Sequence, residues 1–122
     1  MIKMSELSKF CITLMMILFA AFCISTQQAY AHAPQNIELA YDKNEQTLKV
    51  TITHKSAFGF HYINSVVIKK NGVVVSTSNY ENQPDPATFN YTYNIAAGKG
   101  DTLEVTAICN LSGSRSATLA IE

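Results

Sequence analysis

Four side chains of this sequence carry donor atoms that borderline metal ions prefer, one thiol and three imidazoles. The thiol belongs to Cys109, and the imidazoles belong to His32, His54 and His61. The other two cysteines lie in an apolar N-terminal stretch that we expect to be removed. A lone thiol in an exported protein has no partner for an internal disulfide. Ligation of one metal ion by this sulfur and these nitrogens is the sharpest explanation of the set.

The first 31 residues have the pattern of a secretory signal peptide. A start with two lysines precedes an apolar run of 15 residues, 10–24, and then the A-x-A cleavage pattern Ala29-Tyr30-Ala31. The run is shorter than the roughly 20 residues of a membrane-spanning helix. We therefore expect cleavage to leave one domain, residues 32–122, secreted or periplasmic and no longer bound to a membrane. His32 would then be the N-terminal residue.

The charge of the predicted domain excludes some classes of partner. Residues 32–122 contain seven Lys and Arg against eight Asp and Glu. Binding to nucleic acid or to an anionic membrane surface calls for a basic surplus, which this domain lacks. We expect no nucleic acid partner. The 91 residues are enough for a single small domain with a modest core.

The domain is predicted to be all-β, an immunoglobulin-like β-sandwich of about seven strands. Short runs of apolar, β-branched and aromatic residues alternate with turn signals at roughly regular spacing, and Asn71-Gly72 is a strong hairpin signal. The predicted strands are 36–41, 46–54, 61–70, 73–78, 87–95, 102–109 and 116–121. With one cysteine, no disulfide can join the two sheets.

Two of the four candidate ligands continue the apolar face of a predicted strand at its C-terminal end. His54 follows Leu48, Val50 and Ile52 in the alternation, and Cys109 ends the matching series in 102–109. Both side chains should therefore point inward at one rim of the sandwich. His61 begins the next strand and can fold back to the same rim, and the short first strand lets His32 reach it.

The residues alone leave the metal and even its presence open. An inward histidine at a strand end is often bonded to backbone, and a cysteine on an apolar face often packs as a small hydrophobe. If an ion binds, thiolate and imidazole suit iron, copper or zinc. A blue-copper site wants an axial methionine, and residues 32–122 have none. A free N-terminal His32 keeps copper open, because its amine and imidazole can bind Cu(II) together.

Short motifs in this chain resemble those of the desulfoferrodoxin and superoxide reductase family. The segment from His54 to His61-Tyr62-Ile63 is similar to H-P-…-H-Y-I-E, and Cys109-Asn110-Leu111-Ser112-Gly113 is similar to C-N-x-H-G. The start at His32-Ala33-Pro34 resembles the family's H-V-P more weakly. The motifs occur in the family's order and span nearly all of residues 32–122.

The resemblance implies an immunoglobulin-like domain with one non-haem iron, four equatorial histidines and an axial cysteine, which reduces superoxide to hydrogen peroxide. By position, His32, His54 and His61 would be equatorial ligands and Cys109 the axial one. Ser112 stands where the family has its fourth histidine. The family's substrate-attracting lysine falls in the predicted leader, and Lys55 is the residue here that could take its place.

Three functions follow. The first is an exported iron protein of the superoxide reductase type, active or attenuated. It would bind superoxide or another small ligand at the metal and receive electrons from a donor protein. The second is a non-catalytic module that binds copper or iron. The third is a metal-free interaction domain that uses the polar segment Tyr80–Pro86 as a binding loop.

Overall fold

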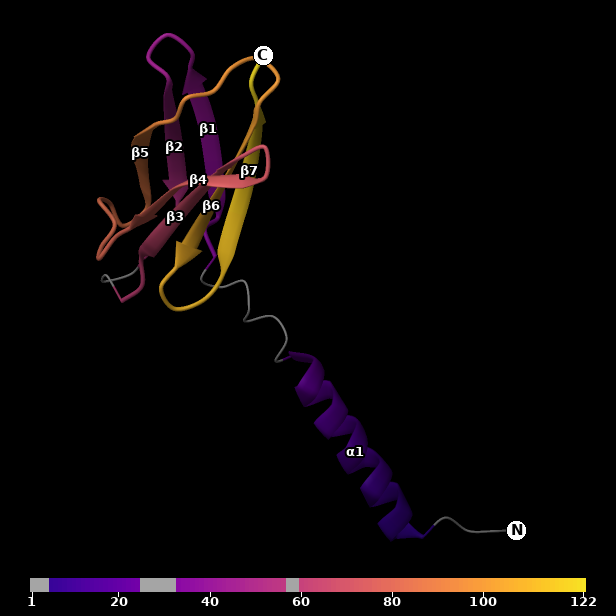
Figure 1. Cartoon of the computed structure of the whole chain (residues 1–122). Coiled ribbons are helices and arrows are strands. Elements are labelled where there is room, and N and C mark those ends of the chain that lie inside the picture. The colour runs from indigo at the N-terminus through magenta and orange to yellow at the C-terminus, as the bar shows by residue number, and fades with distance from the viewer. Residues whose placement is uncertain (1–4, 25–32, 57–59) are drawn as a thin grey trace. The chain divides into compact units, whose positions relative to one another are not determined.

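The computed structural model describes residues 5–24, 33–56 and 60–122 (Figure 1). The chain divides into two compact units, Met1–Ala31 and His32–Glu122. In the first unit, helix α1 spans Glu6–Ile24 and covers the apolar run of the predicted leader. Within the described ranges, no helix combines the length and the apolar character that crossing a membrane requires. The signal peptide itself stays a prediction.

The second unit confirms the predicted all-β fold of seven strands. Their bounds lie within two residues of those expected, and they are β1 (Asn36–Asp42), β2 (Thr47–Thr53), β3 (Ile63–Lys70), β4 (Val73–Asn79), β5 (Thr88–Asn94), β6 (Thr102–Cys109) and β7 (Ser114–Ala120). The last strand starts at Ser114, two residues earlier than predicted, because the preceding turn is tight: the Cys109 N–H donates to the Gly113 carbonyl at 3.0 Å.

The strands form two antiparallel sheets that pack face to face (Figure 1). One sheet has the order β1-β2-β5 and the other β4-β3-β6-β7. This is the immunoglobulin-like arrangement in which the fourth strand extends the sheet of the third, sixth and seventh. At the β3–β4 hairpin, Asn71 and Gly72 have φ of 52° and 83°, as the predicted Asn-Gly turn requires.

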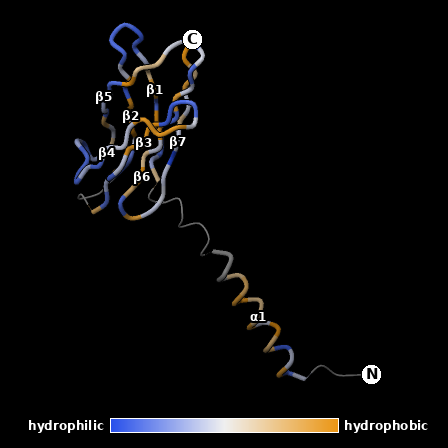
Figure 2. Tube along the Cα trace, in the orientation of Figure 1, coloured by the Kyte–Doolittle hydropathy of each residue, from blue (hydrophilic) through white to orange (hydrophobic). Residues whose placement is uncertain are grey.

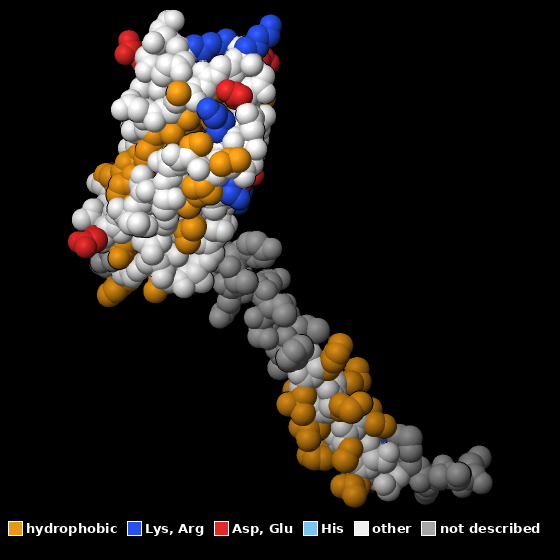
Figure 3. All heavy atoms as spheres, viewed as in Figure 1, with side chains coloured by type: hydrophobic (Ala, Val, Ile, Leu, Met, Phe, Trp, Pro, Cys, Tyr) orange, Lys and Arg blue, Asp and Glu red, His pale blue; other side chains and the backbone are white. Residues whose placement is uncertain are grey.

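The core lies between the sheets and follows the alternation of the central strands. Figure 2 shows apolar and polar residues mixed along the strands, as expected when one face of each is buried. The side chains with no exposed surface come from β2, β3 and β6, and they are Leu48, Val50, Ile52, Ile63, Val66, Ile68, Leu103, Val105 and Ala107. The valines of edge strand β4 are exposed, and hydrophobic side chains reach the face of the sandwich seen in Figure 3.

Three tyrosines connect the edge strands of the two sheets. Tyr80, which follows β4, stacks on Tyr91 of β5 with ring centroids 4.3 Å apart, and its hydroxyl lies 2.8 Å from that of Tyr93. Burial, with a smaller contribution from Tyr80, raises the pKa of Tyr91 to about 12. Burial and then the hydrogen bond with Tyr80 also raise the pKa of Tyr93. These hydroxyls therefore resist ionisation in the folded protein.

The end of the sandwich where β1 leads into β2 is closed by hydrogen bonds to backbone. The Tyr41 hydroxyl donates to the Ile95 carbonyl at 2.6 Å and accepts from the Ala97 N–H at 3.0 Å. The Gln46 amide donates to the carbonyls of Lys43 and Ala97 and accepts from the Ala97 N–H. Each of these partners of Tyr41 and Gln46 is a main-chain N–H or carbonyl group, so the role of the network is structural.

Candidate metal centre

His54 ends the buried face of β2, as the alternation predicted. Its side chain is 1% exposed and continues the row of Val50 and Ile52. The His54 N–H donates to the Ala87 carbonyl at 2.8 Å, which ties this strand end to the start of β5. The imidazole therefore extends from a fixed strand end at the rim of the core, opposite the end that Tyr41 closes.

Cys109 ends the buried face of β6 in the same way and is 4% exposed. The next residue, Asn110, holds the segment before β3 in place. The Asn110 N–H donates to the Tyr62 carbonyl at 3.0 Å, and the Asn110 side-chain oxygen accepts from the Tyr62 N–H at 2.9 Å. The residue after Cys109 and the residue after His61 are thus joined by two hydrogen bonds.

A β-bulge at the start of β3 sets the position of His61. In the pairing of β3 with β6, Ile63 lies opposite Cys109. The next pair joins Ser65 to Ile108, so Asn64 is an extra residue in β3. The prediction of one regular strand over 61–70 missed this irregularity, since nothing in the hydrophobic pattern alone marks the inserted residue.

The bulge changes which residues face the core. Ile63 and Val66 are both fully buried although they are three residues apart. Side chains alternate along a regular strand, so a strand that buried Val66 without a bulge would turn Tyr62 inward. With the bulge, His61 shares the inner side with Ile63 and meets Cys109.

The three side chains converge. Their ligand atoms all lie within 4.8 Å of one another, and the Cys109 Sγ lies 3.6 Å from the His61 Nδ1. The rings of His54 and His61 meet edge to face, with centroids 4.9 Å apart and planes at 89°. His54 and Cys109 are buried and His61 is half-buried, so the cluster is shielded but within reach of the surface.

The arrangement fits a metal ion. With bonds of about 2.3 Å to sulfur and about 2.05 Å to nitrogen, a tetrahedral ion separates the two donor atoms by roughly 3.6 Å. The distance from the Cys109 Sγ to the His61 Nδ1 has this value. Two imidazoles and one thiol form the mixed nitrogen and sulfur set that suits iron, copper and zinc over calcium or magnesium. The cluster is therefore a candidate metal site, with its metal open.

The other predicted site residues have different outcomes. His32 lies outside the described residues, and its place as a ligand stays a prediction. Lys55 is exposed directly after His54, with its N–H donating to the Gln35 side chain at 3.1 Å. Ser112 is exposed in the turn before β7.

The chain next to His32 lies against the turn that follows Cys109. A Cβ added to Gly113 would come within 2.9 Å of the Ala33 backbone nitrogen, so the two backbones are in close contact. The Arg115 side chain donates to the Pro34 carbonyl at 2.7 Å. These contacts hold residues 33 and 34 beside the loop from Cys109 to β7.

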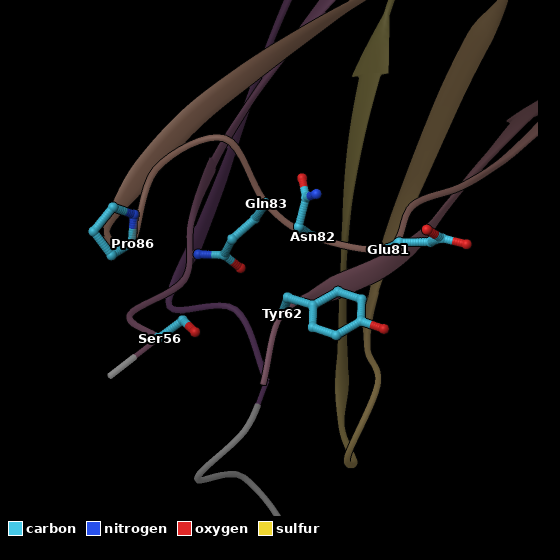
Figure 4. Close-up of a pocket in the computed structure, with 6 residues that line it drawn as sticks. All are labelled: Ser56, Tyr62, Glu81, Asn82, Gln83 and Pro86. Carbon is cyan, nitrogen blue, oxygen red and sulfur yellow. The ribbon is translucent and has the colours of Figure 1, made fainter. Parts of the chain in front are cut away.

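The segment Tyr80–Pro86, considered above as a binding loop, supports the cluster from one side. A pocket of about 200 Å³ lies at its base and is lined by Ser56, Tyr62, Glu81, Asn82, Gln83 and Pro86 (Figure 4). The Ser56 hydroxyl donates to the His61 carbonyl. The Gln83 side chain bonds to His54. The motif at Cys109 includes Asn110 and the segment Tyr80–Pro86 includes Gln83, but sequence reasoning gave no supporting role to Gln83, Ser56 or Asn110, because residue type and spacing carry no signal of a contact made only in the fold.

Comparison with known proteins found neither a matching family model nor a similar curated protein. Among solved structures, a superoxide reductase (neelaredoxin) from Ignicoccus hospitalis is 20% identical, with a TM-score of 0.45 over 75% of this chain and 80% of that one. A variant of the same protein reaches 21% and 0.48 over 78% and 82%. Fibronectin(III)-like modules of Clostridium thermocellum CbhA match at 18% and 0.38 over 71% and 97%. At these values, the comparisons assign this chain to no family.

Proposed function

We propose that this protein binds one metal ion through His54, His61 and Cys109, with iron as the native metal, and that the centre reduces superoxide to hydrogen peroxide. The observation that carries the proposal is the convergence of these donors within 4.8 Å at one rim of the sandwich. The residues and the order of the surrounding motifs resemble those of the superoxide reductase family. This resemblance supports iron over copper and zinc, which suit the same donor atoms.

Different residues would hold the ion and attract the substrate. A bound iron would supply a redox centre with an open position for one electron transfer to superoxide, which takes up two protons to form hydrogen peroxide. His54 and His61 would hold the ion, and the Cys109 thiolate would donate electron density to it. Lys55 is exposed beside His54, where its ammonium can attract an anion. An electron-donor protein would restore the reduced state.

The N-terminal part of the proposal rests on the leader pattern of residues 1–31 and, for His32, on the contact of Ala33. We propose that residues 1–31 are a signal peptide, that the mature protein is secreted or periplasmic, and that His32 supplies a further ligand. The close contact of Ala33 with the turn after Cys109 supports His32 as a ligand, because it ties the adjoining chain to that turn.

A visible spectrum tests the iron centre. The full chain, loaded with Fe(II) without oxygen and then oxidised, is expected to show a thiolate-to-Fe(III) charge-transfer band. The band should vanish in Cys109→Ala and persist in the matched control Ser112→Ala, since Ser112 is exposed. An oxidised, iron-loaded protein without a visible band would rule out the thiolate-ligated iron centre.

The exposed Ser112 favours a second function, a metal-binding module without catalysis. The resemblance places the family's fourth histidine at this position, and a serine hydroxyl is a poor metal ligand at neutral pH. Superoxide consumption distinguishes the two functions. A catalytic centre weakened by the missing ligand should become faster in Ser112→His, whereas a non-catalytic module should stay inactive in both forms while it still binds metal.

A further inference from the structure

We propose that Gln83 is a positioning residue that fixes the tautomer and orientation of His54, so that Nε2 is the nitrogen presented to a metal. The part of this inference that concerns a metal rests on the proposed function. The part that concerns the tautomer does not, because it follows from hydrogen bonds that involve no ion.

Gln83 extends from the β4–β5 connection toward the side of the pocket where Ser56 and Tyr62 lie (Figure 4), and its whole side-chain amide is hydrogen-bonded there. Its Oε1 lies 2.8 Å from the His54 Nδ1 and 3.2 Å from the Ile63 nitrogen. Its Nε2 lies 2.8 Å from both the His54 carbonyl and the Asp85 carbonyl. Four contacts match the two acceptor sites and two donor hydrogens of a primary amide.

The partners determine which end of the amide is the oxygen. The Ile63 main-chain nitrogen can only donate, and the two carbonyls can only accept. The observed orientation of Gln83 satisfies all three, whereas a flipped amide would set donor against donor and acceptor against acceptor. The oxygen therefore faces His54 as an acceptor.

The amide orientation in turn determines the state of the imidazole. An acceptor at 2.8 Å from Nδ1 requires that Nδ1 carry a hydrogen. In a neutral imidazole, the lone pair is then on Nε2. A hydrogen bond at one ring nitrogen that leaves the other for a metal is the usual arrangement around metal-binding histidines. Here the acceptor is a neutral amide.

The segment that carries Gln83 is itself held firmly. The Asp85 carboxylate accepts from the N–H groups of Ala87 and Thr88 at 2.8 and 3.1 Å. Pro84 and Pro86 restrict the backbone on either side of Asp85. The Ser56 N–H donates to the Pro86 carbonyl at 2.9 Å, which joins the segment to the chain just after His54. This anchoring lets one side chain set the angle of the ring.

NMR of the full chain, labelled with ¹⁵N and free of metal, tests the tautomer directly. At a pH where an ordinary imidazole is neutral, long-range ¹H–¹⁵N correlations distinguish the two tautomers. His54 is expected to carry its hydrogen on Nδ1. In Gln83→Leu the population should move toward the Nε2–H form, while the matched control Asn82→Ala, from the same segment, should keep the native tautomer. A wild-type His54 protonated on Nε2, or an unchanged tautomer in Gln83→Leu, would overturn the proposal.

A second variant keeps the proposal testable if Gln83→Leu does not fold. In Gln83→Glu a carboxylate still accepts from Nδ1, so the native tautomer should persist although the donors to the His54 and Asp85 carbonyls are lost. Loss of the Nδ1–H form in that variant would also contradict the inference.

Metal affinity separates this inference from the proposed function. With Zn²⁺ as the probe, Gln83→Leu should bind about 10- to 100-fold more weakly than the wild type. Asn82→Ala should bind as tightly as the wild type. If the wild type binds no metal while His54 still has its hydrogen on Nδ1, the metal site fails and the positioning role stands. If metal binds but Gln83→Leu has native affinity, the positioning role fails.

Discussion

The two ends of the sandwich are each closed by a glutamine, and they use it differently. At one end, the partners of Gln46 and Tyr41 among the described residues are main-chain groups, which the two side chains hold in a closed turn. At the other end, the Gln83 side chain makes four bonds where that of Gln46 makes three, and one of its partners is the imidazole of His54. That imidazole lies beside a second one and a thiol. The difference teaches that a half-buried glutamine amide can either close a fold or orient a reactive side chain, and that only its partners reveal which.

The largest expected effect that separates the two ends is on metal affinity. His54→Ala removes one of three donors, so the affinity for Zn²⁺ should fall by at least about 100-fold. Competition with a chelator of known affinity measures this change. Tyr41→Phe, at the opposite end, should leave the affinity unaltered. Equal zinc binding by His54→Ala and the wild type would show that the cluster is not a metal site.

Two glycines with nearly the same backbone sharpen the comparison. Gly113 has φ of 86° and contacts Ala33 at the metal end, while Gly100 has φ of 92° with open space around it. Each alanine variant bears the strain of a positive φ, about 1–2 kcal/mol. Gly113→Ala must also push back the Ala33 backbone, so it should lose roughly 1 kcal/mol more free energy of unfolding than Gly100→Ala. Urea denaturation measures both, and equal losses would mean that the Ala33 contact contributes nothing.

A change at the end that Tyr41 and Gln46 close should alter the stability of the protein and leave its metal affinity unaltered. Tyr41→Phe leaves the Ala97 N–H and the Ile95 carbonyl without the hydroxyl, which should lower the free energy of unfolding by about 1–3 kcal/mol. Urea denaturation measures the loss, and a zinc titration of the same variant should match the wild type. A variant that kept full stability would show that water replaces the hydroxyl without penalty.

The smallest effect belongs to the tyrosines between the ends and appears only at high pH. The pKa of Tyr91 is raised from 10.0 to about 12, so the folded state disfavours its ionisation. The resulting stability is complete below about pH 10 and should be lost as the pH rises toward 12. Thermal unfolding across this window measures the slope. Tyr91→Phe should flatten it, and an equal slope in the two proteins would assign the effect to other groups.

Much of the fold could be predicted from the sequence because alternation is a local property. The row from Leu48 to His54 and the end of β6 at Cys109 point inward as their spacing indicates. The convergence of His61 on Cys109 depends on a bulge, and the hydrogen bond of His54 depends on a glutamine 29 residues away. Neither has a signature in the hydrophobic pattern, so the ligand candidates could be predicted but not their support. His32 stays a prediction.

The bulge at Asn64 has a consequence for changes in chain length. Most strands tolerate substitution better than the gain or loss of a residue, and here the strand has one extra residue, Asn64, between His61 and the regular pairs that follow. Deletion of Asn64 would leave a regular strand in which Val66, Ile63 and His61 still face the core, whereas deletion of Tyr62 would turn His61 toward water. Loss of the Tyr62 codon, with every donor still encoded, is thus expected to abolish zinc binding, while loss of the Asn64 codon should preserve it. The chelator competition described above would reveal the difference.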